Sequence, residues 1–214
     1  RYADDFSIYC QSQNQAKMTA QAIAKFLKTK LKLTINTEKS GIRRPVNFTL
    51  LGFGFVPTYK KGSKNDYQLV VAEKAWKKLK ERLKSISRKT APVKLEERIA
   101  KIKEVQRGWL NYFRGTSIMG KLRDLDGWLR NRLRYCIWHD WKKPERKRKN
   151  LIRLGVDPDH AYAFSRTRKG GWAIAQSPIL NTTITLKRLK QRGYQSLTDV
   201  YIELNPSLCE PPNT

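Results

Sequence analysis

The chain has 214 residues, of which 39% are hydrophobic and 10% aromatic, so it is long enough to bury a core in one or two domains. Its 45 lysines and arginines outnumber the 18 aspartates and glutamates, which gives a formal net charge of +27. Such a charge indicates a polyanionic partner, and the phosphate backbone of a nucleic acid is the usual one. No run of 18 apolar residues and no signal peptide occurs, so we expect no membrane partner and a cytoplasmic location.

The first ten residues carry two adjacent carboxylates, Asp4 and Asp5. Tyr2 and Ala3 precede them, and an alternation of apolar and polar residues follows from Phe6, which together predict a strand, a turn and a strand. An isolated Asp-Asp pair is typical of a simple turn, because Asp bonds its own backbone there. Carboxylates at the tip of a hairpin also suit Mg²⁺, which takes oxygen ligands. Asp4 and Asp5 are therefore candidate metal ligands.

The next part of the chain alternates between helical and extended patterns. Apolar spacing predicts a helix over residues 16–33, and a short strand from Leu33 leads to a polar turn that contains Lys39. Two β-rich runs follow at residues 48–56 and 67–71, joined by a basic hairpin loop at residues 60–66. Near residue 72 the apolar period changes from two to about 3.6 residues, which predicts a domain boundary.

Three amphipathic helices are predicted after this boundary, from about residue 73 to a break at Pro92, over residues 95–113 and over residues 119–141. Core packing explains their apolar stripes but not the cations on their outer faces, which are typical of a helical bundle beside nucleic acid. Farther on we expect the following elements: a basic loop at 144–149, a helical piece at 151–164 interrupted by Gly155 and Pro158, a cationic turn at 166–172 able to touch phosphate, and short helices at 183–193 and 198–204.

Cysteine and histidine do not form a recognisable site. Cys10, Cys136 and Cys209 are far apart and lack a Cys-x-x-Cys pair, so neither a disulfide framework nor a zinc site is expected. His139 and His160 lie near no serine or cysteine that would act as a nucleophile, so we expect them in surface roles.

Several motifs resemble one family of enzymes. The run from Tyr2 to Phe6 resembles the Tyr-x-Asp-Asp motif of reverse transcriptases, in the form found in enzymes encoded by group II introns. Leu51-Gly52-Phe53 is similar to the turn with which reverse transcriptases grip the primer end. The run Gly-Trp-Leu-Asn-Tyr-Phe at residues 108–113 closely matches the signature of the maturase, or thumb, region. These motifs stand in the family's order, so the chain resembles the C-terminal half of a group II intron reverse transcriptase/maturase.

The resemblance implies an α+β fold, in which a partial polymerase palm of antiparallel β-hairpins with a helix is followed by an all-α helical thumb bundle. It implies palm residues 1–72 with catalytic hairpin and primer grip, a thumb or maturase domain at 73–143 and a C-terminal extension of that domain at 144–214. Because the chain starts almost directly at the catalytic hairpin, we expect it to be a C-terminal piece of a longer protein.

The resemblance also implies RNA-directed DNA synthesis with Mg²⁺ as cofactor and deoxynucleoside triphosphates as substrates. Asp4 and Asp5 would hold the metal, and Lys39 would lie near the incoming nucleotide. Because the fingers and another catalytic strand are missing, we expect this chain alone to be inactive in synthesis. The implied partners are group II intron RNA, whose splicing and mobility the protein would assist, and an RNA/DNA template-primer. The implied source is bacterial.

The helical region supplies the candidate nucleic-acid-binding side chains, which are Arg107, Arg114, Arg123, Arg130, Arg132, Arg134, Lys142 and Lys143. The alternative function is a non-catalytic RNA-binding maturase module, in which Asp4-Asp5 is only a turn. Retron and CRISPR-associated reverse transcriptases share the hairpin, so they also stay open. The sequence does not fix the oligomeric state.

Overall fold

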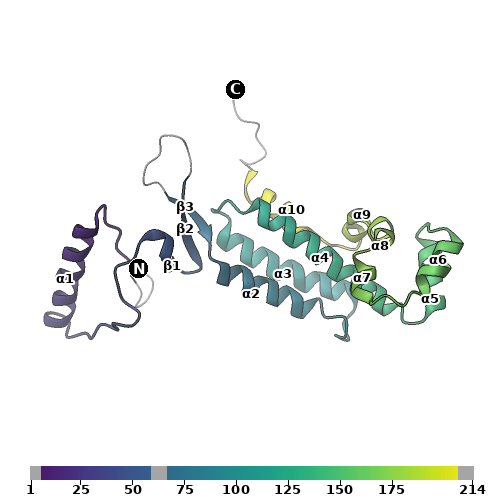
Figure 1. Ribbon diagram of the computed structural model, residues 1–214, viewed down its shortest axis with the longest axis horizontal. Coiled ribbons are helices and arrows are strands. Elements are labelled where there is room, and N and C mark those ends of the chain that lie inside the picture. The colour runs from purple at the N-terminus through teal and green to yellow at the C-terminus, as the bar shows by residue number, and fades with distance from the viewer. Residues whose placement is uncertain (1–5, 59–66, 207–214) are drawn as a thin grey trace, which may run out of the picture. The chain divides into compact units, whose positions relative to one another are not determined.

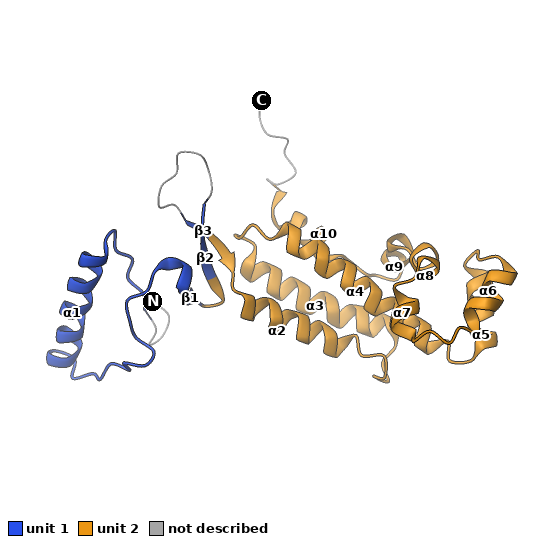
Figure 2. Ribbon diagram, viewed as in Figure 1, with its two compact units in different colours: residues 1–50, 54–68 blue, residues 51–53, 69–214 orange. Residues whose placement is uncertain are grey.

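The computed structural model describes residues 6–58 and 67–206 (Figure 1). These residues form ten α-helices and one small sheet of three strands in the order β1-β2-β3, which confirms the α+β class. The chain divides into two compact units (Figure 2). Unit 1 comprises residues 1–50 and 54–68, and unit 2 comprises residues 51–53 and 69–214. The three-part domain division, and the assignment of palm and thumb, stay predictions.

Unit 1 contains one α-helix among its described residues, α1 (Gln13–Thr29). Its N-cap is Ser12, whose Oγ accepts a hydrogen bond from the Gln15 amide at 3.2 Å, so the predicted helix is confirmed with an earlier start and an earlier end. None of the residues of α1 is buried, and Phe26 is 54% exposed. The apolar stripe of α1 therefore has no core to pack against within the described part of unit 1.

Two predicted strands of unit 1 are absent from the described residues. Residues 6–10 are irregular, so the prediction of a strand there is wrong. The strand predicted from Leu33 is also absent, and the chain instead makes a turn in which Asn36 Oδ1 accepts from the amides of Glu38 and Lys39 at 3.1 and 3.2 Å. An asparagine side chain that bonds nearby amides competes with the pairing that a strand requires.

The three strands form where the sequence predicts β structure. They are β1 (Thr49–Leu50), β2 (Phe53–Pro57) and β3 (Tyr67–Val71), preceded by a 3₁₀ turn at Pro45–Asn47. The basic loop predicted at residues 60–66 lies outside the described residues. The change from strand to helix falls at Ala72, as the change of period predicts.

Three long helices form the main bundle of unit 2, and all three were predicted from apolar spacing. They are α2 (Glu73–Ile86), α3 (Leu95–Phe113) and α4 (Met119–Asp140). Their apolar stripes meet in one core, with Leu83, Ile102, Leu110, Leu122, Leu129 and Leu133 among its fully buried side chains. Burial of each such side chain contributes about 1.5–3 kcal/mol of transfer free energy, so this core is the main source of stability in unit 2.

A buried arginine holds the connection between α2 and α3. Arg98 is 1% exposed, and its Nη1 donates to the carbonyl oxygens of Ile86 and Arg88 at 2.7 and 2.6 Å. Its Nη2 donates to the carbonyl oxygens of Ala91 and Val93 at 3.2 and 3.4 Å. These bonds tie the end of α2 to the loop that leads to α3. The carbonyl oxygens of Arg88 and Ala91 also accept from backbone amides, at 3.2 and 2.8 Å.

Six shorter helices complete unit 2. They are α5 (Pro144–Arg153), α6 (Pro158–Ser165), α7 (Gly171–Ala175), α8 (Pro178–Thr183), α9 (Leu186–Gln191) and α10 (Leu197–Leu204). The prediction of a basic loop at residues 144–149 is wrong, because these residues form the start of α5. Pro144 occupies the first helical position, where the missing N–H costs nothing, so this proline starts a helix instead of ending one.

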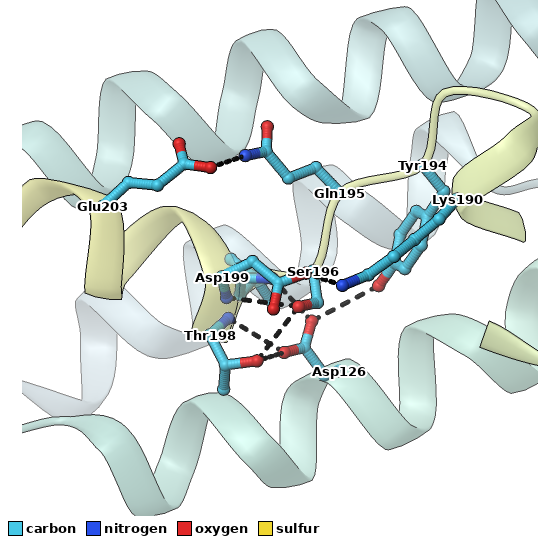
Figure 3. A network of polar contacts seen from close by, with 9 residues as sticks. Asp126, Lys190, Tyr194, Gln195, Ser196, Thr198, Asp199 and Glu203 are labelled. Atoms are coloured by element: carbon cyan, nitrogen blue, oxygen red, sulfur yellow. Dashed lines mark hydrogen bonds and ion pairs between the residues drawn. The ribbon is translucent and has the colours of Figure 1, made fainter. Parts of the chain in front are cut away.

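A buried carboxylate on α4 fixes the N-terminus of α10 (Figure 3). Asp126 is 1% exposed and accepts bonds from the Leu197 amide at 2.7 Å and from the Thr198 amide and hydroxyl at 3.0 and 2.8 Å. Tyr194 donates to the same carboxylate at 3.3 Å, and burial together with that negative charge raises the pKa of the Tyr194 hydroxyl well above its usual value. The N-terminus of α10 is thus held by its N-cap Ser196, whose Oγ accepts from the Asp199 amide at 3.2 Å, and by a carboxylate about 70 positions away in sequence.

Candidate nucleic-acid interface

The turn predicted as a primer grip is a tight hairpin connection. Leu51 and Gly52 join β1 to β2, and both have positive φ, at 52° and 84°. A two-residue connection of this kind matches the twist of the flanking strands, but it is unfavourable for a leucine. At Gly52 a Cβ atom would lie 3.0 Å from Phe113 Cζ, so both the backbone angle and the space require glycine.

The Gly-Trp-Leu-Asn-Tyr-Phe signature at residues 108–113 holds this turn in place. Tyr112 Oη donates to the Leu51 carbonyl oxygen at 3.0 Å, and the Phe53 ring lies 5.4 Å from the Tyr112 ring and 4.9 Å from the Phe113 ring. Phe113 is buried, whereas Tyr112 is 52% exposed. Phe113 of the signature thus packs in the core, and Tyr112 just before it positions the turn. Sequence reasoning missed this link between the two motifs.

A larger aromatic cluster joins the turn to the bundle. The Trp109 ring lies 4.7 Å from Trp76 on α2 and 4.6 Å from Phe113, measured between ring centroids. Lys121 approaches the Trp76 ring to 5.7 Å and forms an ion pair with Glu73 at 3.1 Å. Tilted ring contacts of this kind add to the stabilisation from burial, so the end of α3 is a fixed platform beneath the turn.

The outer face of α2 is the most cationic part of the bundle. Its six cations are all exposed, and none of them forms an ion pair with a described residue; they are Lys74, Lys77, Lys78, Lys80, Arg82 and Lys84. Unpaired cations on one helix repel one another, and a polyanion relieves this repulsion. The arrangement is suited to the phosphate backbone of a nucleic acid.

The candidate cations on α3 and α4, or just after these helices, fall into an exposed and an internal group. Exposed on the surface are Arg107, Arg114, Arg123, Lys142 and Lys143, and Arg130 is half-buried. These side chains can reach a phosphate, and their role in binding stays a prediction.

The internal group consists of two arginines with intramolecular partners. Arg132 donates to the Ser87 carbonyl oxygen at 2.7 Å and to the Lys84 carbonyl oxygen at 3.2 Å, so it caps the end of α2. Arg134 is 7% exposed and donates to the Ile184 carbonyl oxygen at 3.0 Å. Burial lowers the pKa of both guanidinium groups. Their contacts favour a packing role over phosphate binding.

Cations and aromatic rings alternate where α2, α4 and α7 meet. Arg132 lies 5.9 Å from the ring centroids of both Trp128 and Trp172, and Lys80 lies 5.4 Å from Trp128. Lys89 lies 5.1 Å from the Tyr135 ring. The sequence offered no signal for this group beyond its composition, because its members come from three separate segments.

The predicted polymerase residues are not brought together by the described part of the chain. Asp4 and Asp5 lie outside the described residues, and Lys39 is exposed on the turn that follows Asn36. Among residues 6–58 and 67–206, no three His, Cys, Asp or Glu side chains gather as a metal ion requires. The described residues therefore do not test the fit of Mg²⁺, and its site stays an expectation. No helix in the same ranges is long and apolar enough to cross a membrane.

A helical bundle with exposed outer cations and a fixed aromatic platform has the features of a nucleic-acid-binding domain. Residues 76–155 match the family model of the group II intron maturase-specific domain. No curated protein matches the chain. The family match confirms the predicted maturase region and supports a role in the maturation, or splicing, of group II introns.

Proposed function

We propose that the protein binds group II intron RNA through the outer face of α2 and assists the splicing of that RNA. The six exposed cations of α2, which form no ion pair with a described residue, carry this proposal, because α2 lies within the maturase-specific domain except for its first residues. The bundle core holds the helix at one orientation, so its cations present a fixed pattern to the phosphates of a structured RNA.

Binding to a transcribed group II intron tests this function. The substitutions Lys74→Gln, Lys78→Gln and Arg82→Gln remove one cationic stripe of α2, since their spacing of four residues places them along one face. We expect weaker binding and a log–log salt slope that is flatter by about 2–3, at about 0.9 per lost phosphate contact. Fluorescence anisotropy at several salt concentrations gives both values.

A matched control removes the same charge from unit 1, through Lys17→Gln, Lys25→Gln and Lys28→Gln on α1. We expect a smaller effect from it. Equal losses from the two triple variants, or equal affinity of the unchanged protein for the intron and for another folded RNA of the same length, would contradict the proposal.

We further propose that residues 1–72 belong to the palm of an RNA-directed DNA polymerase that uses deoxynucleoside triphosphates on a template-primer. The Tyr-Ala-Asp-Asp-Phe motif supports this proposal, as does the turn at Leu51 and Gly52, whose exposed leucine side chain is available to a primer end. We expect the purified 214-residue chain to bind template-primer without extending it, because the motif supplies only two of the carboxylates of such a site. Template-dependent incorporation of a labelled nucleotide by this chain would contradict the expectation.

A further inference from the structure

The helical hairpin of α5 and α6 is a second cationic surface, distinct from α2. Residues 142–169 contain ten cations and only three acids, Glu145, Asp157 and Asp159. Lys147 is half-buried, and the other nine cations are exposed. The exposed cations are Lys142, Lys143, Arg146, Arg148, Lys149, Arg153, Arg166, Arg168 and Lys169. The surface continues past residue 155, where the match to the maturase-specific domain ends.

Two of these arginines are held by one aromatic ring. The guanidinium carbon of Arg166 lies 4.2 Å from the centroid of the Tyr162 ring, and that of Arg148 lies 5.5 Å from it. Arg148 comes from α5, whereas Tyr162 belongs to α6 and Arg166 ends that helix. We call this group of three residues the Tyr162 clamp. An aromatic ring attracts a guanidinium group to its face, so both arginines are positioned without being neutralised.

The clamp retains most of its positive charge. Arg166 contacts one carboxylate, Glu145, at 3.6 Å, and the two side chains are 44% and 67% exposed. Arg148 forms no ion pair among the described residues. An exposed ion pair contributes little, so the N–H groups of both guanidinium groups remain available to an external anion.

Core packing does not account for the position of the Tyr162 ring. Leu151 and Ala161, which are fully buried, join α5 to α6, whereas Tyr162 is 49% exposed. Lys147 on α5, by contrast, is packed against the bundle. It lies 4.6 Å from the Trp138 ring, and burial lowers its pKa. Lys147 thus packs toward the bundle, and the clamp lies on a part of the hairpin open to solvent.

We propose that the Tyr162 clamp binds the backbone phosphates of a single strand of nucleic acid that has unpaired bases. A guanidinium group already held on a ring loses less freedom when it makes a bidentate contact with phosphate than a free one does. The half-exposed ring and the guanidinium planes can also stack on bases, but only on bases that are not already paired in a duplex. The inference goes beyond the proposed function, because it adds a second site for a different form of nucleic acid.

A pair of substitutions at one position tests the clamp without changing the net charge. Tyr162→Leu removes the ring that positions both arginines, whereas Tyr162→Phe keeps the ring and removes only the hydroxyl. The probes are a labelled oligouridylate, an oligothymidylate and an RNA duplex of the same length, bound to the full 214-residue chain. Circular dichroism and the thermal midpoint verify that both variants fold, which the exposure of Tyr162 leads us to expect.

We expect Tyr162→Leu to bind a single strand about fivefold more weakly, from two exposed cation–π contacts, and Tyr162→Phe to bind like the unchanged protein. The strand that loses more affinity, RNA or DNA, is the ligand that the clamp prefers. Arg148→Gln should weaken single-strand binding and flatten the salt slope by about 0.7, whereas Arg153→Gln, on the same helix without a ring contact, should have a smaller effect.

Unchanged binding by Tyr162→Leu would overturn the clamp and leave only a diffuse cationic surface. An equal loss for the duplex would overturn the preference for unpaired strands. These outcomes are separate from those of the proposed function: a protein that binds oligouridylate in a Tyr162-dependent way but shows no preference for intron RNA supports the clamp and contradicts intron binding.

Discussion

At the scale of single residues, Asp126 shows how one carboxylate connects distant parts of the chain. The last helix, α10, has eight residues, and a helix this short is unstable in isolation. Asp126 supplies four hydrogen-bond acceptor contacts to the segment around its N-terminus. A buried carboxylate is costly unless such bonds satisfy it, so the carboxylate and the helix end each stabilise the other.

We therefore expect Asp126→Ala to lower the free energy of unfolding by about 3 kcal/mol, because it leaves two amides and two hydroxyls without their acceptor. Urea unfolding followed by circular dichroism measures the change. Asp126→Asn is the matched control, since it retains one carbonyl oxygen and should have a smaller effect. Similar stabilities of the alanine variant and the unchanged protein would show that α10 does not depend on this carboxylate.

Two of the buried charged side chains make contacts that were not predicted from the sequence. Asp126 stands four residues after Leu122 and three before Leu129, so it occupies a position of the buried stripe of α4. Arg98 stands in the same way between Leu95 and Ile102 on α3. A charged residue at a stripe position was the available signal for an internal role. The partners could not be predicted, because they are backbone groups of other segments.

At the scale of elements, long periodic stripes were predicted well and short segments were not. The three bundle helices follow from apolar spacing alone, because each has enough turns to show the period. The start of α5 was missed, since its first residues are almost all charged and only Leu151 is buried. The strand expected from Leu33 failed for a different reason, because a strand depends on a partner that local sequence does not specify.

The position of the Leu51–Gly52 turn could be predicted from the sequence, but the contacts that stabilise it could not. A glycine between two β-rich runs indicates a hairpin connection. The positive φ of Leu51 is costly for a leucine, and the bond from Tyr112, some 60 residues later, offsets part of that cost. The motif at residues 108–113 was recognised from the sequence, but the contact between the two motifs required the fold.

At the scale of the whole molecule, the buried core is unevenly distributed. The buried hydrophobic cluster of the described residues runs from Val71 to Tyr201, and all of it belongs to unit 2. In the described part of unit 1, α1 has no buried residue, and Phe6, Ile8, Tyr9 and Phe26 are each about half exposed or more. Because burial of apolar surface is the main favourable term in folding, we infer that unit 2 carries nearly all the stability.

A shortened chain of residues 49–214 tests this distribution, since it keeps the three strands and the whole bundle. We expect it to unfold cooperatively, with a free energy of unfolding within about 1 kcal/mol of that of the full chain, because no large buried cluster is removed. Urea unfolding followed by tryptophan fluorescence is suitable, since all six tryptophans lie in unit 2. The complementary peptide of residues 1–48 contains no tryptophan, and it should show no cooperative transition when followed by circular dichroism. A loss of several kcal/mol in the shortened chain would mean that unit 1 stabilises the bundle, and the cationic face of α2 would then have to be studied only in the full chain.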